Sequence, residues 1–443
     1  MMRETQNSRP DIAVIFDNIG PYHQARLKGA AAVCKVHGIQ LSGASKDYAW
    51  VTEGSDSGWI STIVLEGPFT VVPVNEFKRR LQATLDRLKP AAIAIPGWSS
   101  LGAFVALEWA KRNSVPIVMM SESTAWDEPR VAWKEWVKRR IVGLASSALV
   151  GGNPHVDYMR QLGMPEDRIF LGYDTVDNAY FSIESQKWRG QETGDREEEA
   201  SPCSTLNSQT STHNHRPYFL SSNRFIEKKN LFRLLQAYAA YGRQPSDGHR
   251  PPLQCWDLVM LGDGELREKL LAHCEILGLN VAMCAPWEHS DSFNIQNSKS
   301  NIIYFPGFRQ IDELPRFYAH AGSFVHASTT EQWGLVVNEA MACGLPVIVS
   351  SRVGCAQDLV EAGVNGFTFD PYDVEQLSQL LGRVSESNFP LSAFGAASTE
   401  RIAAWGPVRF AEGLKAAVKE AVRIGVRRYT VWDFILLKLL QRR

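Results

Sequence analysis

Two glutamates separated by seven residues, Glu331 and Glu339, mark the segment of this sequence that is best suited to chemistry. The run from Leu335 to Cys343 carries apolar residues at helical spacing, and Gly344 follows as a typical C-cap residue. This pattern predicts a helix that begins at about Gly334. One carboxylate then precedes the helix, and the other lies in its second turn.

The start of this predicted helix is suited to bind an anion. The first backbone N–H groups, those of Leu335 and Val336, lack intrahelical acceptors and lie at the positive end of the helix dipole. A glycine at position 334 lets a ligand such as a diphosphate approach them closely. Ionised carboxylates only accept hydrogen bonds, so Glu331 and Glu339 are natural partners for the hydroxyls of a sugar and a ribose.

A second segment supplies positive charge. Residues 218–221 read as a buried strand, and an amphipathic helix begins near Leu231. Arg224 and Lys229 therefore lie in a loop at the carboxyl end of the strand, which is the edge where open α/β sheets bind ligands. Lys228, between these two residues, is expected to be solvated.

These two segments resemble the signature of the retaining glycosyltransferases of family 4 (group 1), which have the two-domain GT-B fold. The resemblance implies that Glu331 contacts the donor sugar, that Glu339 contacts the ribose, and that Arg224 and Lys229 stabilise the donor diphosphate. This sequence has Trp333 where the family usually has Phe, a change expected to alter the size of the pocket.

The resemblance also implies two further donor contacts. Gly262, in a Gly-Asp-Gly segment, is expected beside the nucleotide, and Phe308 begins the loop that holds the base mainly through backbone groups. A G-x-G segment alone is weak support for a nucleotide site. The family transfers sugars with retention of configuration, and the absence of an Asp-x-Asp motif here agrees with a site that needs no metal and no cofactor.

Candidate residues for the acceptor lie in the first half of the chain. Gly20 and His23 occupy the turn after the first predicted strand, where glycine permits close approach by the donor sugar or the acceptor. The alternative for His23 is that it only caps the turn. Glu122 and Asp127 follow another strand and are candidates to hold acceptor hydroxyls.

Composition excludes several classes of protein. The chain has 443 residues, of which 44% are hydrophobic, so it is long enough for two or three domains with large cores. A net charge of −1 argues against a nucleic-acid partner. The seven cysteines are scattered without a CxxC pair, which indicates reduced thiols in the cytoplasm and neither a zinc site nor a disulfide framework.

Apolar runs and helical stretches alternate along two parts of the chain, as in parallel sheets covered by helices. We therefore predict an α/β protein of the GT-B type, with two Rossmann-like domains that face each other across a cleft. The domains are residues 11–182, for the acceptor, and 217–404, for the nucleotide sugar. Residues 183–216 are predicted to be a polar, disordered linker, and residues 405–443 to be helices that return to the first domain.

Two segments bear on location. Tryptophans accompany lysines and arginines in residues 126–140, and apolar and basic residues mix in residues 427–443. This composition is typical of helices that lie on anionic membranes, so both segments are candidates for peripheral membrane contact. Residues 1–10 are polar and lack a following signal-peptide core, and no apolar run is long enough to span a bilayer.

The sequence thus predicts a hexosyltransferase that moves a sugar from a nucleoside-diphosphate donor to an acceptor hydroxyl in polysaccharide or glycolipid biosynthesis. The acceptor is a sugar, a lipid-linked molecule or a small molecule, and the base and the sugar of the donor stay open. Two alternatives remain at this stage. One is a nucleotide-sugar epimerase with the same architecture, and the other is a non-catalytic protein that binds sugar nucleotides.

Overall fold

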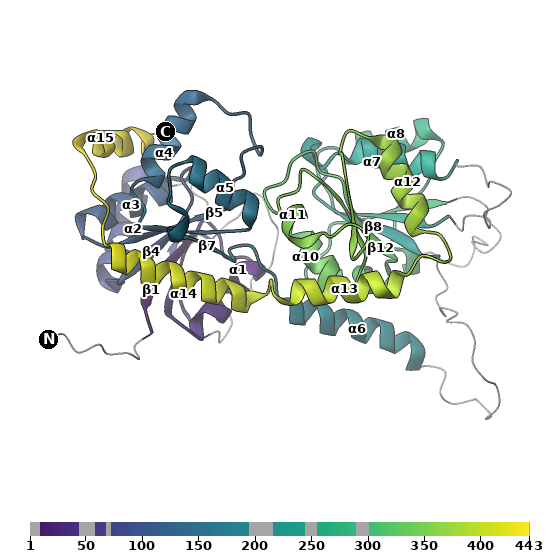
Figure 1. Ribbon diagram of the computed structural model, residues 1–443, viewed down its shortest axis with the longest axis horizontal. Coiled ribbons are helices and arrows are strands. Elements are labelled where there is room, and N and C mark those ends of the chain that lie inside the picture. The colour runs from purple at the N-terminus through teal and green to yellow at the C-terminus, as the bar shows by residue number, and fades with distance from the viewer. Residues whose placement is uncertain are drawn as a thin grey trace. The chain divides into compact units, whose positions relative to one another are not determined.

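The computed structural model describes residues 9–43, 58–67, 72–194, 216–243, 255–288 and 301–442. The chain divides into two compact units, of which unit 1 comprises Met1–Asp177 with Trp405–Arg443 and unit 2 comprises Asn178–Ala404. Each unit contains one seven-stranded sheet, and helices cover both faces of each sheet (Figure 1). The predicted two-domain α/β fold is confirmed.

The sheet of unit 1 is parallel throughout and has the strand order β3-β2-β1-β4-β5-β6-β7. Its strands are β1 (Asp11–Phe16), β2 (Lys35–Ser42), β3 (Ile60–Leu65), β4 (Ala92–Pro96), β5 (Ile117–Ser121), β6 (Ser147–Val150) and β7 (Ile169–Leu171). Ala13 and Ile15 of β1 belong to one core cluster, while Ile12, Val14 and Phe16 belong to another. Both faces of the sheet are therefore buried, as parallel sheets require.

The helices of unit 1 are α1 (Pro21–Ala31), α2 (Val74–Leu88), α3 (Leu101–Arg112), α4 (Ala132–Val142), α5 (Asn153–Gln161), the 3-10 turn η2 (Glu166–Arg168), α14 (Pro407–Ile424) and α15 (Val431–Leu440). The last two come from residues 405–443. Helix α14 lies along the sheet and adds Phe410, Leu414 and Val418 to the core (Figure 1). No helix in the described part of the chain is both long and apolar enough to cross a bilayer.

The sheet of unit 2 is also parallel and has the order β10-β11-β9-β8-β12-β13-β14. Its strands are β8 (Tyr218–Ser222), β9 (Asp257–Leu261), β10 (Asn280–Ala282), β11 (Ile302–Gly307), β12 (Ser323–His326), β13 (Val347–Ser350) and β14 (Gly366–Phe369). The helices are α6 (Asn178–Gly194), η3 (Glu227–Lys229), α7 (Leu231–Tyr241), α8 (Arg267–Leu277), η4 (Pro286–Glu288), α9 (Leu314–His320), α10 (Leu335–Ala342), α11 (Ala356–Leu359), α12 (Val374–Val384) and α13 (Leu391–Ala403).

Two strands lack the apolar run that marks a strand in the sequence. Strand β2 contains His37, Gly38 and Gln40 among its apolar residues, so it lacks the continuous apolar run that marks a buried strand. Pairing with β1 on one side and β3 on the other nevertheless buries it. Strand β10 is a short edge strand with two exposed residues and carries little apolar signal.

The predicted linker of residues 183–216 is wrong at its start. Residues Asn178–Gly194 form helix α6, which packs on α9 and α10 of unit 2. Buried Phe181 anchors the helix, and its ring meets Tyr318 edge-on with centroids 6.0 Å apart. A few apolar contacts thus order a largely polar segment, and unit 1 ends at Asp177 rather than at residue 182. The rest of the predicted linker, residues 195–215, lies outside the described residues.

We expect Leu414→Ala to lower the free energy of unfolding by about 2–5 kcal/mol, because Leu414 is fully buried between α14 and the sheet. Urea denaturation of the full chain measures this change. Val422→Ala on the same helix is the control, since Val422 is 52% exposed and its loss should change stability by less than about 0.5 kcal/mol. Equal effects would show that α14 is not part of the core.

Candidate functional site

Two loops of unit 2 meet through a buried ion pair. Lys229 ends the 3-10 turn η3 after β8, and Glu331 lies in the loop between β12 and α10. The Lys229 ammonium group donates to Glu331 Oε2, and both side chains are only 12% exposed. The backbone supports the same contact, because Thr329 N–H donates to the carbonyl of Lys228 over 2.9 Å. Residues that the sequence separates by about a hundred positions thus share one site.

Several groups surround the Glu331 carboxylate. Lys228 Nζ lies 3.3 Å from Oε1, so this lysine is an ion-pair partner of Glu331. The sequence predicts only that Lys228 is solvated. Ser328 Oγ is 3.5 Å and His326 Nε2 is 3.7 Å from Oε2. Burial opposes ionisation, but the His326 imidazole and the Lys229 charge more than offset it, so the pKa of Glu331 lies well below its usual value.

His326 lies beside the Glu331 carboxylate, with 3.7 Å between Nε2 and Oε2. It is fully buried at the end of β12, and Nε2 lies 3.2 Å from Ser328 Oγ. Burial lowers the pKa of His326, which favours the neutral imidazole. The same cause, burial, lowers the pKa of Lys229, while the Glu331 carboxylate opposes that change and the charges of Lys228 and Arg224 add to it.

Arg224 belongs to the same cluster of charges. It is half-buried in the loop after β8, and its positive charge acts on Lys229. The loop is held by Gly262, whose φ is +129° and whose added Cβ would lie 1.9 Å from the Asn223 carbonyl oxygen. Phe225 N–H donates to the Asp263 carbonyl over 2.8 Å. Gly262 therefore allows the segment after β9 to approach the backbone of Asn223, and this close approach fixes the loop that carries Arg224.

Helix α10 begins beside the ion pair. Its N-cap, Gly334, has a φ of +99°, and an added Cβ would lie 2.8 Å from Val353 Cγ1 and 3.7 Å from Glu331 Cγ. Glycine thus allows the chain to turn sharply between the acidic side chain and the helix. Leu335 and Val336 follow as half-buried residues in the first turn, as predicted.

Trp333, the departure from the usual Phe, has a chemical as well as a steric effect. The indole is fully buried, and Nε1 donates to Asn338 Oδ1 over 2.9 Å. A phenylalanine cannot make this hydrogen bond. The tryptophan thereby fixes the loop before α10 to the first turn of the helix.

Glu339 is enclosed by the protein. It is 0% exposed, and the hydroxyl of Tyr318 donates to Oε2 over 2.8 Å. Tyr318 lies on α9 and packs against Phe181 of α6. Sequence reasoning missed Tyr318, because an aromatic residue on an amphipathic helix gives no sign that its hydroxyl reaches a carboxylate on another helix.

Phe308 directly follows β11, at the same carboxyl edge of the sheet. Its side chain is 43% exposed, which is unusual for a phenylalanine next to a buried strand. Phe308 thus lies at the edge of the sheet where the sequence places it.

In unit 1, Gly20 and His23 form the start of α1. Gly20 is the N-cap, and its N–H donates to His23 Nδ1 over 3.3 Å. The imidazole ring also lies against Phe16, with centroids 4.3 Å apart. Burial, with a smaller effect of Arg26, lowers the pKa of His23 to about 3, so the ring is neutral. The capping role considered from the sequence is therefore present.

Glu122 has neighbours that the sequence did not suggest. Arg26 of α1 forms a buried ion pair with Asp174, with 3.6 Å between Nη2 and Oδ1, and donates from Nε to the Thr175 carbonyl over 3.1 Å. Burial, and then the charge of Glu122, raise the pKa of Asp174 well above its usual value. Asp174 follows the end of β7 by three residues. Its position after a strand was the only feature of the sequence that could have marked it as a candidate site residue.

Asp127 stabilises its own loop. Its Oδ2 accepts from Thr124 N–H over 3.2 Å, and its Oδ1 pairs with the Arg130 guanidinium group. Arg130 also donates to the Ala125 carbonyl over 2.9 Å and to the Tyr158 hydroxyl over 2.8 Å. The Asp127 carboxylate, which the sequence predicts to hold hydroxyls of the acceptor substrate, is therefore bonded within its own loop.

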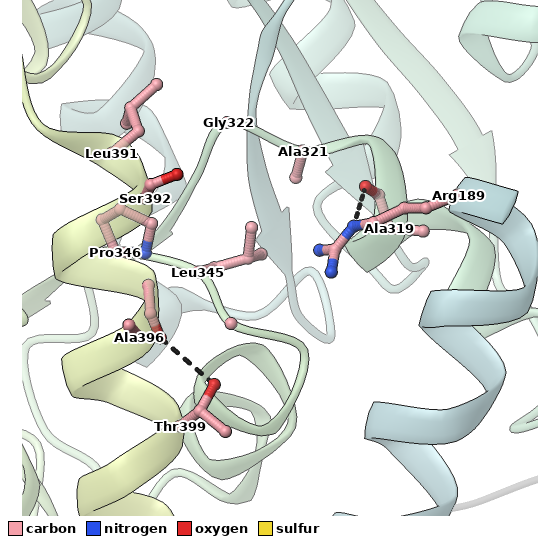
Figure 2. A pocket seen from close by; sticks show the side chains of 12 residues that line it. Arg189, Ala319, Ala321, Gly322, Leu345, Pro346, Leu391, Ser392, Ala396 and Thr399 are labelled. Carbon is pink, nitrogen blue, oxygen red and sulfur yellow. Dashed lines mark hydrogen bonds between the residues drawn. The ribbon is translucent and has the colours of Figure 1, made fainter. Parts of the chain in front are cut away.

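A pocket lies at the opposite edge of the unit 2 sheet, where β12 and β13 begin (Figure 2). Arg189 of α6 reaches into it and donates to the carbonyls of Ala319 and Cys343, over 2.9 and 2.7 Å, at the ends of α9 and α10. These bonds satisfy helix C-termini and are structural. Among the described residues, no cluster of His, Cys, Asp and Glu is suited to hold a metal ion.

Residues 293–401 match the family model of the group 1 glycosyl transferases. This match contains Glu331, Gly334 and Glu339. A curated relative, sucrose-phosphate synthase 4 of Arabidopsis thaliana, is 29% identical over 173 residues, which are 38% of this chain and 15% of that protein. The curated relatives that the chain matches share only a small part of their own length with it.

Solved structures extend the likeness to nearly the whole chain. A sucrose-phosphate synthase from Thermosynechococcus elongatus is 19% identical, with a TM-score of 0.63, and the match covers 92% of this chain and 97% of that one. HepE from Anabaena, solved in complex with UDP, is 16% identical with a TM-score of 0.61, covering 91% and 98%. At these identities the likeness shows the fold, which is that of GT-B glycosyltransferases.

We expect Glu331→Gln to lower the free energy of unfolding by about 3–5 kcal/mol at pH 7, because it leaves the buried Lys229 charge without its partner. The depressed pKa means that the carboxylate stabilises the fold above about pH 4.5 and that this stabilisation is lost as the pH falls further. The difference between the variant and the wild type should therefore shrink below pH 4.5. Urea denaturation across pH 3–7 gives the comparison.

The control is Glu361→Gln, which removes an exposed ion pair with Arg401 in the same unit, with 2.7 Å between the charged atoms. That change should cost about 0–1 kcal/mol. Equal losses for the two variants at pH 7 would contradict the role of burial.

Proposed function

We propose that the protein is a glycosyltransferase that moves a sugar from a nucleoside diphosphate to an acceptor hydroxyl. One observation carries this proposal. Lys229 pairs with Glu331 beside the N-terminus of α10, at the carboxyl edge of the unit 2 sheet, and the charge of Arg224 acts on Lys229. Cationic groups and helix N–H groups suit a diphosphate, while an ionised carboxylate suits sugar hydroxyls.

Binding of the donor would exchange the partners of these groups. Lys229 and Lys228 both pair with the single carboxylate of Glu331 in the structure. A diphosphate would take over the lysine charges together with Arg224, and Glu331 would turn to the hydroxyls of the sugar. As the bond between sugar and phosphate breaks, negative charge grows on the diphosphate, and preorganised cations stabilise that charge without a metal ion.

We infer that the anomeric configuration is retained, as the family resemblance implies. A depressed pKa makes Glu331 a weak general base, and neutral, buried His326 faces Ser328. Both observations support a mechanism in which the departing phosphate oxygen takes the proton of the acceptor. The contact of Glu339 with the ribose stays a prediction from the family resemblance, because the Glu339 side chain is 0% exposed and accepts a hydrogen bond from Tyr318.

The acceptor is proposed to bind at unit 1. Gly20 presents backbone at the start of α1, and half-buried Glu122 lies near Asp174 and Arg26. A carboxylate supported in this way can accept hydrogen bonds from a hydroxyl. Asp127 is left out of this proposal because Arg130 and Thr124 already engage it.

We place the reaction in a reducing compartment, the cytoplasm. All six cysteines in the described part of the chain are free, and four of them are buried. Unpaired thiols are typical of cytosolic proteins.

A donor panel tests the proposal. UDP-, GDP- and ADP-sugars are added separately to the full chain, and one nucleotide should stabilise it by about 2.7 kcal/mol at a hundred times its Kd. Release of the nucleoside diphosphate should then require an acceptor. Conversion of the sugar nucleotide without any acceptor would indicate an epimerase, and binding without release would indicate a non-catalytic protein. Either result would overturn the proposal.

Arg224→Ala should lower kcat by about 10²–10³-fold while it changes donor affinity much less, because its charge acts mainly on the departing diphosphate. Steady-state kinetics and donor titration separate the two effects. Arg243→Ala is the control, because Arg243 is exposed at the end of α7 and should leave both values unchanged. A variant at Arg224 that loses affinity and turnover equally would refute the assigned role.

A further inference from the structure

Helix α15 of unit 1 buries polar as well as apolar residues. Asp433 and Leu437, followed by Gln441, form its buried side. Asp433 Oδ1 accepts from Arg140 Nε over 2.8 Å, and Gln441 Nε2 donates to Glu108 Oε2 over 2.8 Å. An ordinary surface helix buries its apolar residues and exposes its polar ones, whereas α15 buries Leu437 together with these two polar side chains.

Other apolar residues of α15 form a row that faces outward. Val431, Ile435 and Leu439 recur at every fourth position and are 74%, 41% and 55% exposed. Trp432 beside them is 75% exposed. A row of large apolar side chains of this kind marks a surface that meets an apolar partner.

Helix α4 continues this surface. Arg140 joins the two helices, since its guanidinium group bonds to Asp433 and, over 3.2 Å, to Thr430 Oγ1. Trp133 and Trp136 of α4 are 52% and 57% exposed. Figure 1 shows α4 and α15 together at one end of unit 1. Trp126, in the predicted segment 126–140, is half-buried and does not belong to this surface.

Acidic and basic side chains lie on different sides of these helices. Acidic side chains are paired on the inner side, where Asp433 meets Arg140, Glu135 meets Lys138 and Glu108 meets Lys438. Basic side chains are exposed around the apolar row, namely Lys134, Arg139, Arg427, Arg428 and Arg442. The surface is therefore apolar in its middle and positive at its border.

A cavity with cationic walls adjoins the row. Lys78 near the start of α2, Lys438 and Arg442 line it together with Asn75 and Gln441. Burial, and then the charge of Lys438, lower the pKa of Lys78, while Glu108, which pairs with Lys438, opposes this change and Arg442 adds to it. An anionic group in this cavity would relieve the repulsion, and the positive end of α2 would favour it further.

We propose that α15 and α4 dock unit 1 on an anionic phospholipid bilayer. Val431, Trp432, Ile435 and Leu439 enter the interface, with Trp133 and Trp136 beside them, and the cavity at Lys78 receives a lipid phosphate. Exposed tryptophans and a basic border are what such an interface selects. A helix of ten residues is about 15 Å long, which is too short to span a bilayer core of about 30 Å. The proposed helix therefore lies on the surface of the membrane.

Vesicle co-sedimentation of the full chain tests this proposal. The protein should bind vesicles of equal phosphatidylcholine and phosphatidylglycerol about tenfold more tightly than vesicles of phosphatidylcholine alone. The combined variant Val431→Ser, Trp432→Ser, Ile435→Ser should lose that binding by about tenfold or more. The control, Val408→Ser with Val422→Ser, changes exposed apolar residues on α14 and should bind as the wild type does.

Charge is tested separately. Lys78→Glu should weaken binding to the anionic vesicles, and Lys419→Glu on α14, the same change at an exposed position of unit 1, should have no effect. Inorganic phosphate at constant ionic strength should not release the protein. Release by phosphate would assign the cavity to a free anion and overturn its role as a lipid site.

Two results would overturn the docking surface itself. One is equal binding of the wild type and the combined α15 variant. The other is a dimer of the wild type, seen by light scattering without vesicles, that the combined variant abolishes, because the surface would then join two copies of the chain. Nucleotide stabilisation, measured on the same samples, reports on sugar transfer independently of these outcomes.

Discussion

The buried ion pair between Lys229 and Glu331 is the contact on which the candidate donor site depends. It joins the loop after β8 to the loop before α10, and Lys228 adds a second cation on the same carboxylate. A buried charge without a partner destabilises the fold, so the charge of Lys229 in one loop requires the carboxylate of Glu331 in the other. The pair therefore stabilises the fold. In the function proposed above, a diphosphate takes the place of the carboxylate that pairs with the two lysines.

Residues of helix α6 support the helices α9 and α10 next to this site. Phe181 of α6 packs on Tyr318, and the Tyr318 hydroxyl fixes Glu339. Arg189 of the same helix holds the ends of α9 and α10 together at the opposite edge of the sheet. A segment with the composition of a linker thus supports two helices that carry the site. Such preorganisation matters because an electrostatic site works best when its groups need not move during the reaction.

Unit 1 places its polar groups differently. Arg26 and Asp174 form a buried pair next to Glu122, in the part of the unit proposed for the acceptor. Helix α15 also buries polar residues, but there the consequence is an apolar surface on the outside. A glycosyltransferase with such a surface could meet acceptors that are themselves bound to a membrane. The two features agree with each other without depending on each other.

The sequence by itself determined the parallel α/β class, most of the strands, and the local geometry around Gly334, because apolar periodicity and glycine positions act over short distances. It also indicated Arg224, Lys229, Glu331 and Glu339, whose residue types and spacing are visible in two short segments. Tertiary structure alone decided that Lys229 pairs with Glu331, that Tyr318 reaches Glu339, that α6 is a helix and that α15 faces outward. These features depend on contacts between residues far apart in the chain, and no local pattern records which side chains such contacts bring together.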